Sequence, residues 1–329
     1  MASTATTPPP TTVVKDAREK LSLMGRLKKG DEVAFLVTFA SALSIILITC
    51  LLVQHLWKDA ALSRHAFGWK FLHSSTWDPV ADDYGALPFI YGTVVTALLA
   101  LVIAVPVGLG AAIFLAELAP RKISNVLTFM IELLAAVPSV IYGLLGIFVM
   151  LPFLRDYVVP LLQKVLGFLP IFQGSFYGVS YFSASCVLAI MIVPFIVSIS
   201  REVLIAVPQA QREAMMALGA TKWDVTWKSV VPYARGGMFG SVFLALARAL
   251  GETMAVTMVI GNVPAISKSL LSPGYTIAAV IANEFTEATG NLYISALIEL
   301  ALVLFAVTMI INALARLLML GMKSQEGAR

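Results

Sequence analysis

Between two long apolar segments lies the polar stretch Glu213-Ala214-Met215-Met216-Ala217-Leu218-Gly219. Its residues favour a helix, Pro208 precedes it at a position that a first helical turn tolerates, and Gly219 stands where helices commonly end. A second helix is predicted directly after it, because Thr221 can cap its N-terminus and Asp224 follows three residues later. Two short helices joined at a glycine would form a compact projection. We therefore expect a docking element for another protein, although an ordinary loop between two spans would also be polar.

The composition is that of an integral membrane protein. Of 329 residues, 59% are apolar and 13% are charged, and the mean hydropathy is +0.88. Soluble domains have about 45–50% apolar and about 25% charged residues. Cys50 and Cys186 lie in apolar segments, which indicates two buried thiols rather than a disulfide. The net charge of +4 is explained by loops that flank apolar segments, so nucleic acid is not an expected partner.

Six apolar stretches are long enough to cross a bilayer, which takes about 20 residues. The sequence therefore predicts an all-α integral membrane domain over 33–320. The expected spans are 33–54, 90–116, 125–153, 181–200, 236–262 and 292–315. Pro106 and Pro138 are the expected bends. Residues 1–32 are predicted to be a disordered, cytoplasmic N-terminal segment, and residues 321–329 a cytoplasmic tail.

The distribution of lysine and arginine orients these spans. With both termini in the cytoplasm, most of the 23 lysines and arginines fall in the N-terminal segment, in the loop 201–235 and near the C-terminus. The loop 201–235, which contains the Glu213 stretch, is therefore predicted to face the cytoplasm. On the opposite side, aromatic residues that lead into the second span are expected to be interfacial anchors: Trp69, Trp77, Tyr84, Phe89 and Tyr91. Residues 154–180 are expected to lie along that outer face.

No enzyme motif is present in the sequence. The phosphate-binding pattern Gly-x-x-x-x-Gly-Lys-Ser/Thr is absent, and so are the His-Glu-x-x-His and Gly-x-Ser-x-Gly patterns. The three histidines, His55, His65 and His73, have no compact metal-ligand spacing. We therefore expect a non-enzymatic chain without a cofactor or metal of its own, and any energy input has to come from a partner.

Two opposite charges lie inside the fifth predicted span, Arg248 and Glu252. Because a charge at the centre of a membrane helix costs about 2.5–3.5 kcal/mol, such residues usually face a cavity or a partner. Spaced four residues apart on one helix, they can touch, and mutual neutralisation is one explanation. The other is that Arg248 meets a translocating anion, since its planar fork suits oxyanions, while Glu252 orients it. Glu132 and Glu299 also lie in predicted spans, and a structural role is favoured for both.

The Glu213 stretch resembles the cytoplasmic coupling loop of ABC-importer permeases. The residues that carry this likeness are Glu213, Ala214, Ala217 and Gly219, followed by Pro232, and Met215 replaces an alanine of the family pattern. The resemblance implies that the loop docks into a groove on an ATP-hydrolysing subunit. It also implies a six-helix, type I (MetI-like) permease fold.

A narrower resemblance is to the PstC family of phosphate-specific permeases. It rests on 247–256 and on three further stretches, 85–93, 137–143 and 258–262, and extends over about 33–320. Family membership implies a bacterial or archaeal plasma-membrane protein that carries phosphate and pairs with a homologous PstA-like permease. It further implies two PstB-like ATPase copies, which bind ATP and Mg²⁺, and a PstS-like external binding protein. The transport-critical pair of the family maps onto Arg248 and Glu252.

Three alternatives stay open at this point. An ABC importer of the same kind could carry another oxyanion, such as phosphonate, molybdate or sulfate, because an arginine can bind each of these anions. An ATP-independent channel or carrier would need no docking loop. A membrane enzyme is disfavoured because a catalytic set is missing from the sequence.

Overall fold

The computed structural model describes residues 31–326, with side chains described for 33–317. The chain up to Lys58 and the chain from Asp59 onward are two separate units. The first described helix is α3 (Asp31–Asp59), an apolar helix of 29 residues. The predicted N-terminal segment 1–32 lies almost wholly outside the described residues.

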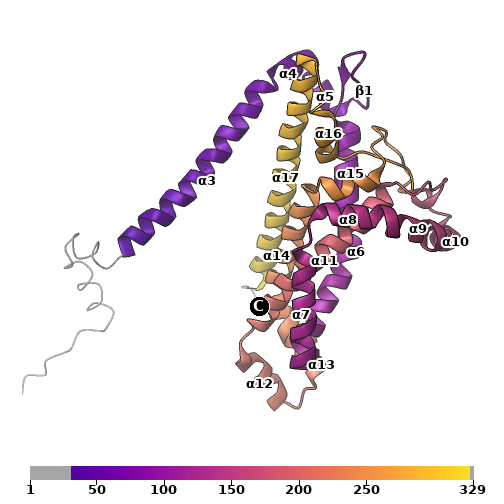
Figure 1. Cartoon of the computed structure of the whole chain (residues 1–329). Coiled ribbons are helices and arrows are strands. Elements are labelled where there is room, and N and C mark those ends of the chain that lie inside the picture. The colour runs from indigo at the N-terminus through magenta and orange to yellow at the C-terminus, as the bar shows by residue number, and fades with distance from the viewer. Residues whose placement is uncertain (1–30, 327–329) are drawn as a thin grey trace, which may run out of the picture. The chain divides into compact units, whose positions relative to one another are not determined.

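Among the described residues from Asp59 onward, the named elements are helical apart from the two strands of one small hairpin (Figure 1). It begins with α4 (Ala61–Phe67), α5 (Lys70–His73), the strands β1 (Trp77–Asp78) and β2 (Asp83–Tyr84), and α6 (Leu87–Ile113), which continues as the π-turn η1 (Phe114–Leu118). Next come α7 (Arg121–Ala135), α8 (Ser139–Leu145), η2 (Gly146–Met150), α9 (Leu151–Phe153), η3 (Leu154–Val158), α10 (Val159–Leu166) and η4 (Pro170–Phe172). The remainder consists of α11 (Tyr181–Ile205), α12 (Gln209–Ala217), α13 (Lys222–Val225), η5 (Thr226–Val230), α14 (Val231–Leu250), α15 (Met254–Ile260), α16 (Ile277–Glu284) and α17 (Asn291–Glu326).

Six helical segments within 31–326 are long and apolar enough to cross a membrane, as the sequence predicts. They are Val33–Asp59, Leu87–Leu118, Ser139–Leu166, Tyr181–Ile205, Lys222–Leu250 and Asn291–Leu317. The last helix extends through Glu326, so it includes the first part of the region predicted as a tail. The fold is therefore the six-helix, all-α membrane fold that was expected.

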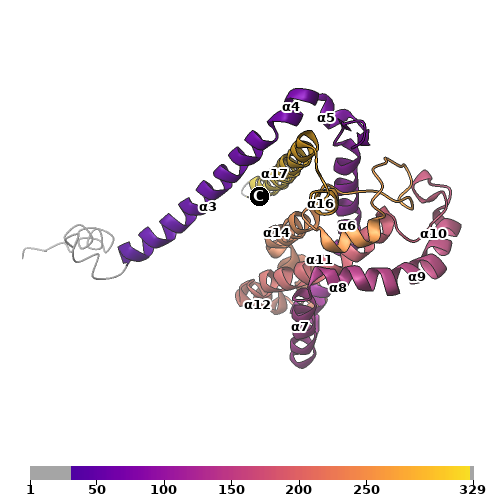
Figure 2. The same cartoon turned by 45° about the horizontal axis from the view of Figure 1, so that its top comes forward.

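The helix α11 is the centre of the second unit. Its apolar window is 67% buried, the highest share among the six candidate spans, and its buried side chains pack against α6 and α14. Figures 1 and 2 show α6 and α14 beside it and α17 on the far side of α14, while α8, α9 and α10 run across the bundle. Gly108 allows α6 to approach α11 closely, because a Cβ there would lie 2.8 Å from Cγ2 of Ile196.

The third predicted span, 125–153, differs from the structure. The chain breaks between α7 and α8, and Pro138 has extended backbone angles of φ −58° and ψ 140°. Proline lacks an N–H and disfavours helix in the residue before it, so the expected bend is a complete interruption. The Tyr142 hydroxyl bridges the break by donating to the carbonyl of Leu134 over 2.7 Å. The helical run then continues to Leu166, over residues predicted to lie in an outer loop.

An aromatic cluster joins the hairpin to α6 and α17. Trp77 packs edge-on against Phe89 with ring centroids 4.9 Å apart, and Tyr84 stacks on Tyr293 at 5.4 Å. Glu284 accepts hydrogen bonds from Trp77 Nε1 at 2.8 Å and from the Tyr293 hydroxyl at 2.7 Å. Tyr84 and Phe89 are fully buried in this unit. The prediction that these two are interfacial anchors is therefore wrong, because their rings are buried among the aromatic residues of this cluster.

One glycine of α6 is required by a backbone contact. A Cβ on Gly92 would lie 2.1 Å from the carbonyl oxygen of Tyr275. A Cβ on Gly110, on the same helix, would meet nothing within 4 Å. The two positions differ in surroundings but share the same secondary structure, which makes them a matched pair.

We expect Gly92→Ala to lower the free energy of unfolding by about 1–3 kcal/mol, the usual cost of overpacking against an element that cannot move aside. Gly110→Ala should be neutral or stabilise by up to about 1 kcal/mol, because alanine is the better helix former. Unfolding midpoints of the purified protein in detergent would test this. Equal effects of the two substitutions would contradict the packing described here.

Candidate functional site

Arg248 lies in the last turn of α14, as the sequence predicts for a charge inside a span. Its guanidinium carbon is 4.9 Å from the ring centroid of Phe195 on α11, a cation–π contact. The Nε atom is buried and has no hydrogen-bond partner among the described residues. A buried donor without an acceptor is costly, so this atom has unused binding capacity for an anion.

The predicted contact of Glu252 with Arg248 is not present in the structure. The helix α14 ends at Leu250, and Gly251 has non-helical angles of φ −95° and ψ 1°. Glu252 therefore does not continue the same helix face, and no ion pair within 4.0 Å joins these two described residues. Instead, Glu252 Oε1 accepts the backbone N–H of Ala255 over 3.3 Å, at the start of α15. The predicted span 236–262 is correspondingly two helices, and the first of them is preceded by helical turns from Lys222.

The helices that follow the two breaks, α8 and α15, pack against each other. Gly143 on α8 allows this approach, since a Cβ there would lie 2.5 Å from Sδ of Met258 and 3.3 Å from Cα of Ala255. At the end of α15, Gly261 has φ +101°, and a Cβ there would lie 2.6 Å from that of Pro273. These contacts give a physical reason for glycine at two positions of the stretches 137–143 and 258–262.

The segment between α11 and α14 has the two short helices that were predicted. α12 ends in a left-handed Gly219 with φ +81°. The Gly219 N–H donates to the carbonyl of Met216 at 2.9 Å, and the Ala220 N–H donates to that of Met215 at 3.2 Å, which is a Schellman cap. Thr221 Oγ1 accepts the Asp224 N–H at 3.2 Å, so the predicted cap of α13 is confirmed.

An ion pair that no sequence motif predicts holds α12 against η1, the continuation of α6. Arg212 Nη2 donates to Glu117 Oε1 at 2.8 Å, and both side chains are at most 15% exposed. The same guanidinium donates to the carbonyls of Leu204 and Val207, where α11 ends. No local pattern could reveal this pair, because 95 positions separate its members.

The predicted docking residues of α12 lie on its surface. Glu213, Ala214, Ala217 and Gly219 are exposed, and the neighbouring Leu218 is 84% exposed. Pro232, the last residue of the predicted coupling pattern, is exposed in the first turn of α14. This arrangement leaves the α12 surface accessible to a partner, while Arg212 anchors the helix from the other side.

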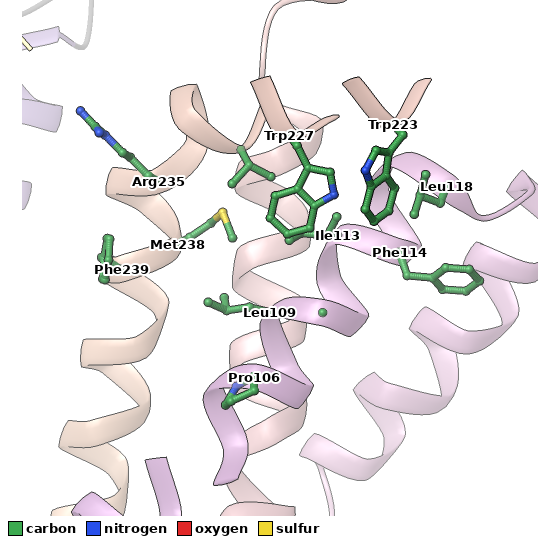
Figure 3. A pocket seen from close by; sticks show the side chains of 12 residues that line it. Pro106, Leu109, Ile113, Phe114, Leu118, Trp223, Trp227, Arg235, Met238 and Phe239 are labelled. Atoms are coloured by element: carbon green, nitrogen blue, oxygen red, sulfur yellow. The ribbon is translucent and has the colours of Figure 1, made fainter. Parts of the chain in front are cut away.

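Figure 3 shows a hollow of about 560 Å³ between α6 and the segment after α12. Trp223 and Trp227 lie side by side at one end, with ring centroids 5.5 Å apart, and Pro106 lies at the other end. Arg235 is the one charged residue of an otherwise apolar lining. The hollow is therefore not a candidate site for an oxyanion.

Comparison with known proteins identifies the class of this chain. A family model described as "Binding-protein-dependent transport system inner membrane component" matches residues 104–323. The chain therefore belongs to the inner-membrane components of binding-protein-dependent transport systems, and its six apolar helices make it a multi-pass protein of that membrane.

Curated relatives narrow the family further. The phosphate transport system permease protein PstC of Mesorhizobium japonicum is 45% identical over 307 residues, which cover 92% of this chain and 94% of that protein. That of Xylella fastidiosa strain 9a5c is 49% identical over 296 residues, covering 89% and 91%. The chain is a member of the PstC family. Among solved structures, an inward-facing MetNI methionine ABC transporter matches 69% of this chain and 93% of that chain, with a TM-score of 0.49 and 15% identity.

We expect Arg212→Gln to loosen α12, because it leaves Glu117 without its partner in a partly buried position. Removing one member of such a pair costs about 3 kcal/mol or more, which corresponds to about a hundredfold faster hydrogen exchange if opening is local. Exchange of the α12 amides, followed by mass spectrometry, measures this. Glu213→Gln is the control, since Glu213 is exposed on the same helix. Unchanged protection in Arg212→Gln would show that the ion pair does not anchor the helix.

Proposed function

We propose that this chain is the permease subunit of an ATP-driven importer of inorganic phosphate. The observation that carries the proposal is Arg248, a guanidinium among apolar helices with a buried Nε that lacks an acceptor. The similar proteins named phosphate transport system permeases support phosphate as the anion. A guanidinium stays charged at any working pH and can donate two parallel hydrogen bonds to a phosphate.

In this proposal Arg248 contacts the anion as it passes between the two sides of the membrane. The Phe195 ring provides a partner for the guanidinium when no anion is present. Glu252 has an indirect role in the substrate pathway. Its carboxylate accepts a backbone N–H at the start of α15, the helix that follows the break after Arg248. Binding at Arg248 should be weak, since a tightly held anion would not be released, and high affinity then belongs to an external binding protein.

The α12 segment couples this pathway to ATP hydrolysis. We infer that both termini and the loop 201–235 face the cytoplasm, where the exposed surface of α12 docks on an ATPase dimer that binds ATP and Mg²⁺. The residues in contact would include Glu213, Ala214, Ala217 and Gly219, with Pro232 in the following helix. A homologous second permease completes the pathway, and an extracytoplasmic binding protein delivers phosphate. Alternation between inward and outward states then follows the ATPase cycle.

Arg248→Gln is expected to reduce ATP-dependent uptake of labelled phosphate at least a hundredfold, because it removes both the charge and the paired N–H donors of the guanidinium. The complex should still assemble. Arg248→Lys should retain part of the uptake, since it keeps the charge alone. Glu252→Gln should retain most of it, because a glutamine oxygen can still accept the Ala255 N–H. Uptake is measured in vesicles that contain all subunits. Normal transport by Arg248→Gln would refute the anion role, and a loss in Glu252→Gln as large as that in Arg248→Gln would indicate a direct role for the carboxylate.

Gly219→Pro is expected to uncouple ATP hydrolysis from transport. Proline cannot adopt the φ of +81° found at this position, so the turn at Gly219 between α12 and α13 must rearrange. We expect the stimulation of ATPase activity by loaded binding protein to fall at least tenfold. Gly240→Ala is the control, because a Cβ there would meet nothing within 4 Å. If stimulation persists in Gly219→Pro, the geometry of this turn does not transmit the signal.

A further inference from the structure

A second hollow, which we call the arginine pocket, lies where η1, α7, α11 and α12 meet. Its volume is about 430 Å³, within the range of about 300–1,000 Å³ of small-molecule sites. Its lining includes the charged residues Glu117, Arg121, Arg201 and Arg212 and the amide residues Asn125 and Gln209. Arg248 does not line it. The arginine pocket is therefore separate from the proposed substrate contact on α14.

The arginine pocket has an excess of positive charge. Three arginines and one glutamate line it, and that glutamate, Glu117, is already bound by Arg212. Arg121 makes no ion pair with a described residue within 4.0 Å. Arg201 pairs at 3.0 Å with Glu202, whose side chain is 71% exposed, and such an exposed pair contributes little.

Arg201 also has an unsatisfied donor. Its side chain is only 15% exposed, and its Nε is buried without a hydrogen-bond partner among the described residues. Buried donors in folded proteins nearly always have a partner, so this atom indicates an acceptor that belongs to a bound molecule. The side-chain amides of Asn125 and Gln209 offer further donors in the same lining.

We propose that the arginine pocket binds a phosphate-type oxyanion. Guanidinium groups match the geometry of phosphate oxygens, and two of them here are in excess over the carboxylate. The anion can come from free inorganic phosphate or from the headgroup of an anionic phospholipid, because the pocket lies at the ends of two membrane-spanning segments, Leu87–Leu118 and Tyr181–Ile205. The choice of inorganic phosphate as one source rests on the transport function proposed above.

An anion in the arginine pocket would stabilise the position of the coupling segment, by which we mean α12 and α13. Gln209 and Arg212 belong to α12, Arg201 to α11 and Arg121 to α7, so one bound phosphate group would connect all three helices. A ligand that binds only the arrangement in which these helices are together stabilises that arrangement. The occupied pocket therefore holds α12 in its anchored position and makes the coupling segment responsive to an oxyanion.

The test uses the complex of the two permeases and the ATPase in lipid nanodiscs, without the external binding protein and with Arg248→Ala in every sample, so that the other expected phosphate contacts are removed. One arm measures binding of labelled inorganic phosphate in discs of phosphatidylcholine alone. The other arm adds phosphatidylglycerol and measures, by mass spectrometry, the lipid retained on the complex after delipidation. Arg201→Gln and Arg121→Gln are compared with Arg155→Gln, an exposed arginine outside the pocket that pairs with Asp156.

We expect one arm to show binding that becomes at least tenfold weaker in Arg201→Gln and Arg121→Gln and is unchanged in Arg155→Gln. Binding in the first arm identifies free phosphate, and retention confined to the second arm identifies a lipid headgroup. Absence of binding in both arms, or binding that Arg201→Gln leaves unchanged, would overturn the proposal. Because Arg248 is absent throughout, neither result depends on whether phosphate passes that residue.

Discussion

Inside a bilayer, no water is available to bond a free backbone group, so a membrane helix can be interrupted only where the protein or a cavity supplies partners. The structure after α6 depends on this constraint. The chain interrupts helix at Pro138 and again at Gly251, and the helices that follow these breaks, α8 and α15, pack against each other. Side chains provide hydrogen-bond partners for backbone groups at both breaks. The Tyr142 hydroxyl donates to the Leu134 carbonyl, and the Glu252 carboxylate accepts the Ala255 N–H. Arg248 lies directly before the second break, where a charged side chain and irregular backbone can share one polar environment.

The coupling segment, which consists of α12 and α13, lies on the surface instead of inside the helix bundle. One side of α12 is exposed, and Arg212 bonds the other side to neighbouring helices. Arg212 joins α12 to Glu117 at the end of α6 and to two carbonyls at the end of α11. The chain also connects α12 directly to α11 before it and, through α13 and η5, to α14 after it. In the proposed mechanism, a displacement of α12 by the ATPase therefore reaches three membrane helices, one of which carries Arg248. This connection explains how a docking event at the membrane surface could change access to a residue inside the membrane.

Much of this arrangement could be predicted from local sequence. The length of the apolar stretches identified six helices, and the spacing of Thr221, Asp224 and Gly219 identified the two caps at the turn between α12 and α13, since each depends on residues close in sequence. Helix continuity across 125–153 and 236–262 was overestimated, because hydropathy is the same on both sides of a break. The predicted span did not end at Leu250, so Glu252 was placed on the same helix face as Arg248, whereas α14 ends between them.

Contacts between distant segments could not be predicted. The Arg212–Glu117 pair joins residues that no motif connects, and the burial of Tyr84 depends in part on Tyr293 of α17, which is distant from it in the sequence. The roles of Arg248 in anion contact and of α12 in docking are still predictions, supported by an unsatisfied donor and an exposed surface.

The central claim is that ATP hydrolysis drives an oxyanion past Arg248 in a complex that contains this chain. It is tested most directly by measuring labelled-phosphate uptake and ATP hydrolysis in the same vesicles, with ATP supplied or withheld on the cytoplasmic side and excess sulfate or molybdate as competitor. We expect uptake that requires ATP, rises in proportion to hydrolysis and resists both competitors. Uptake that proceeds without ATP would contradict it.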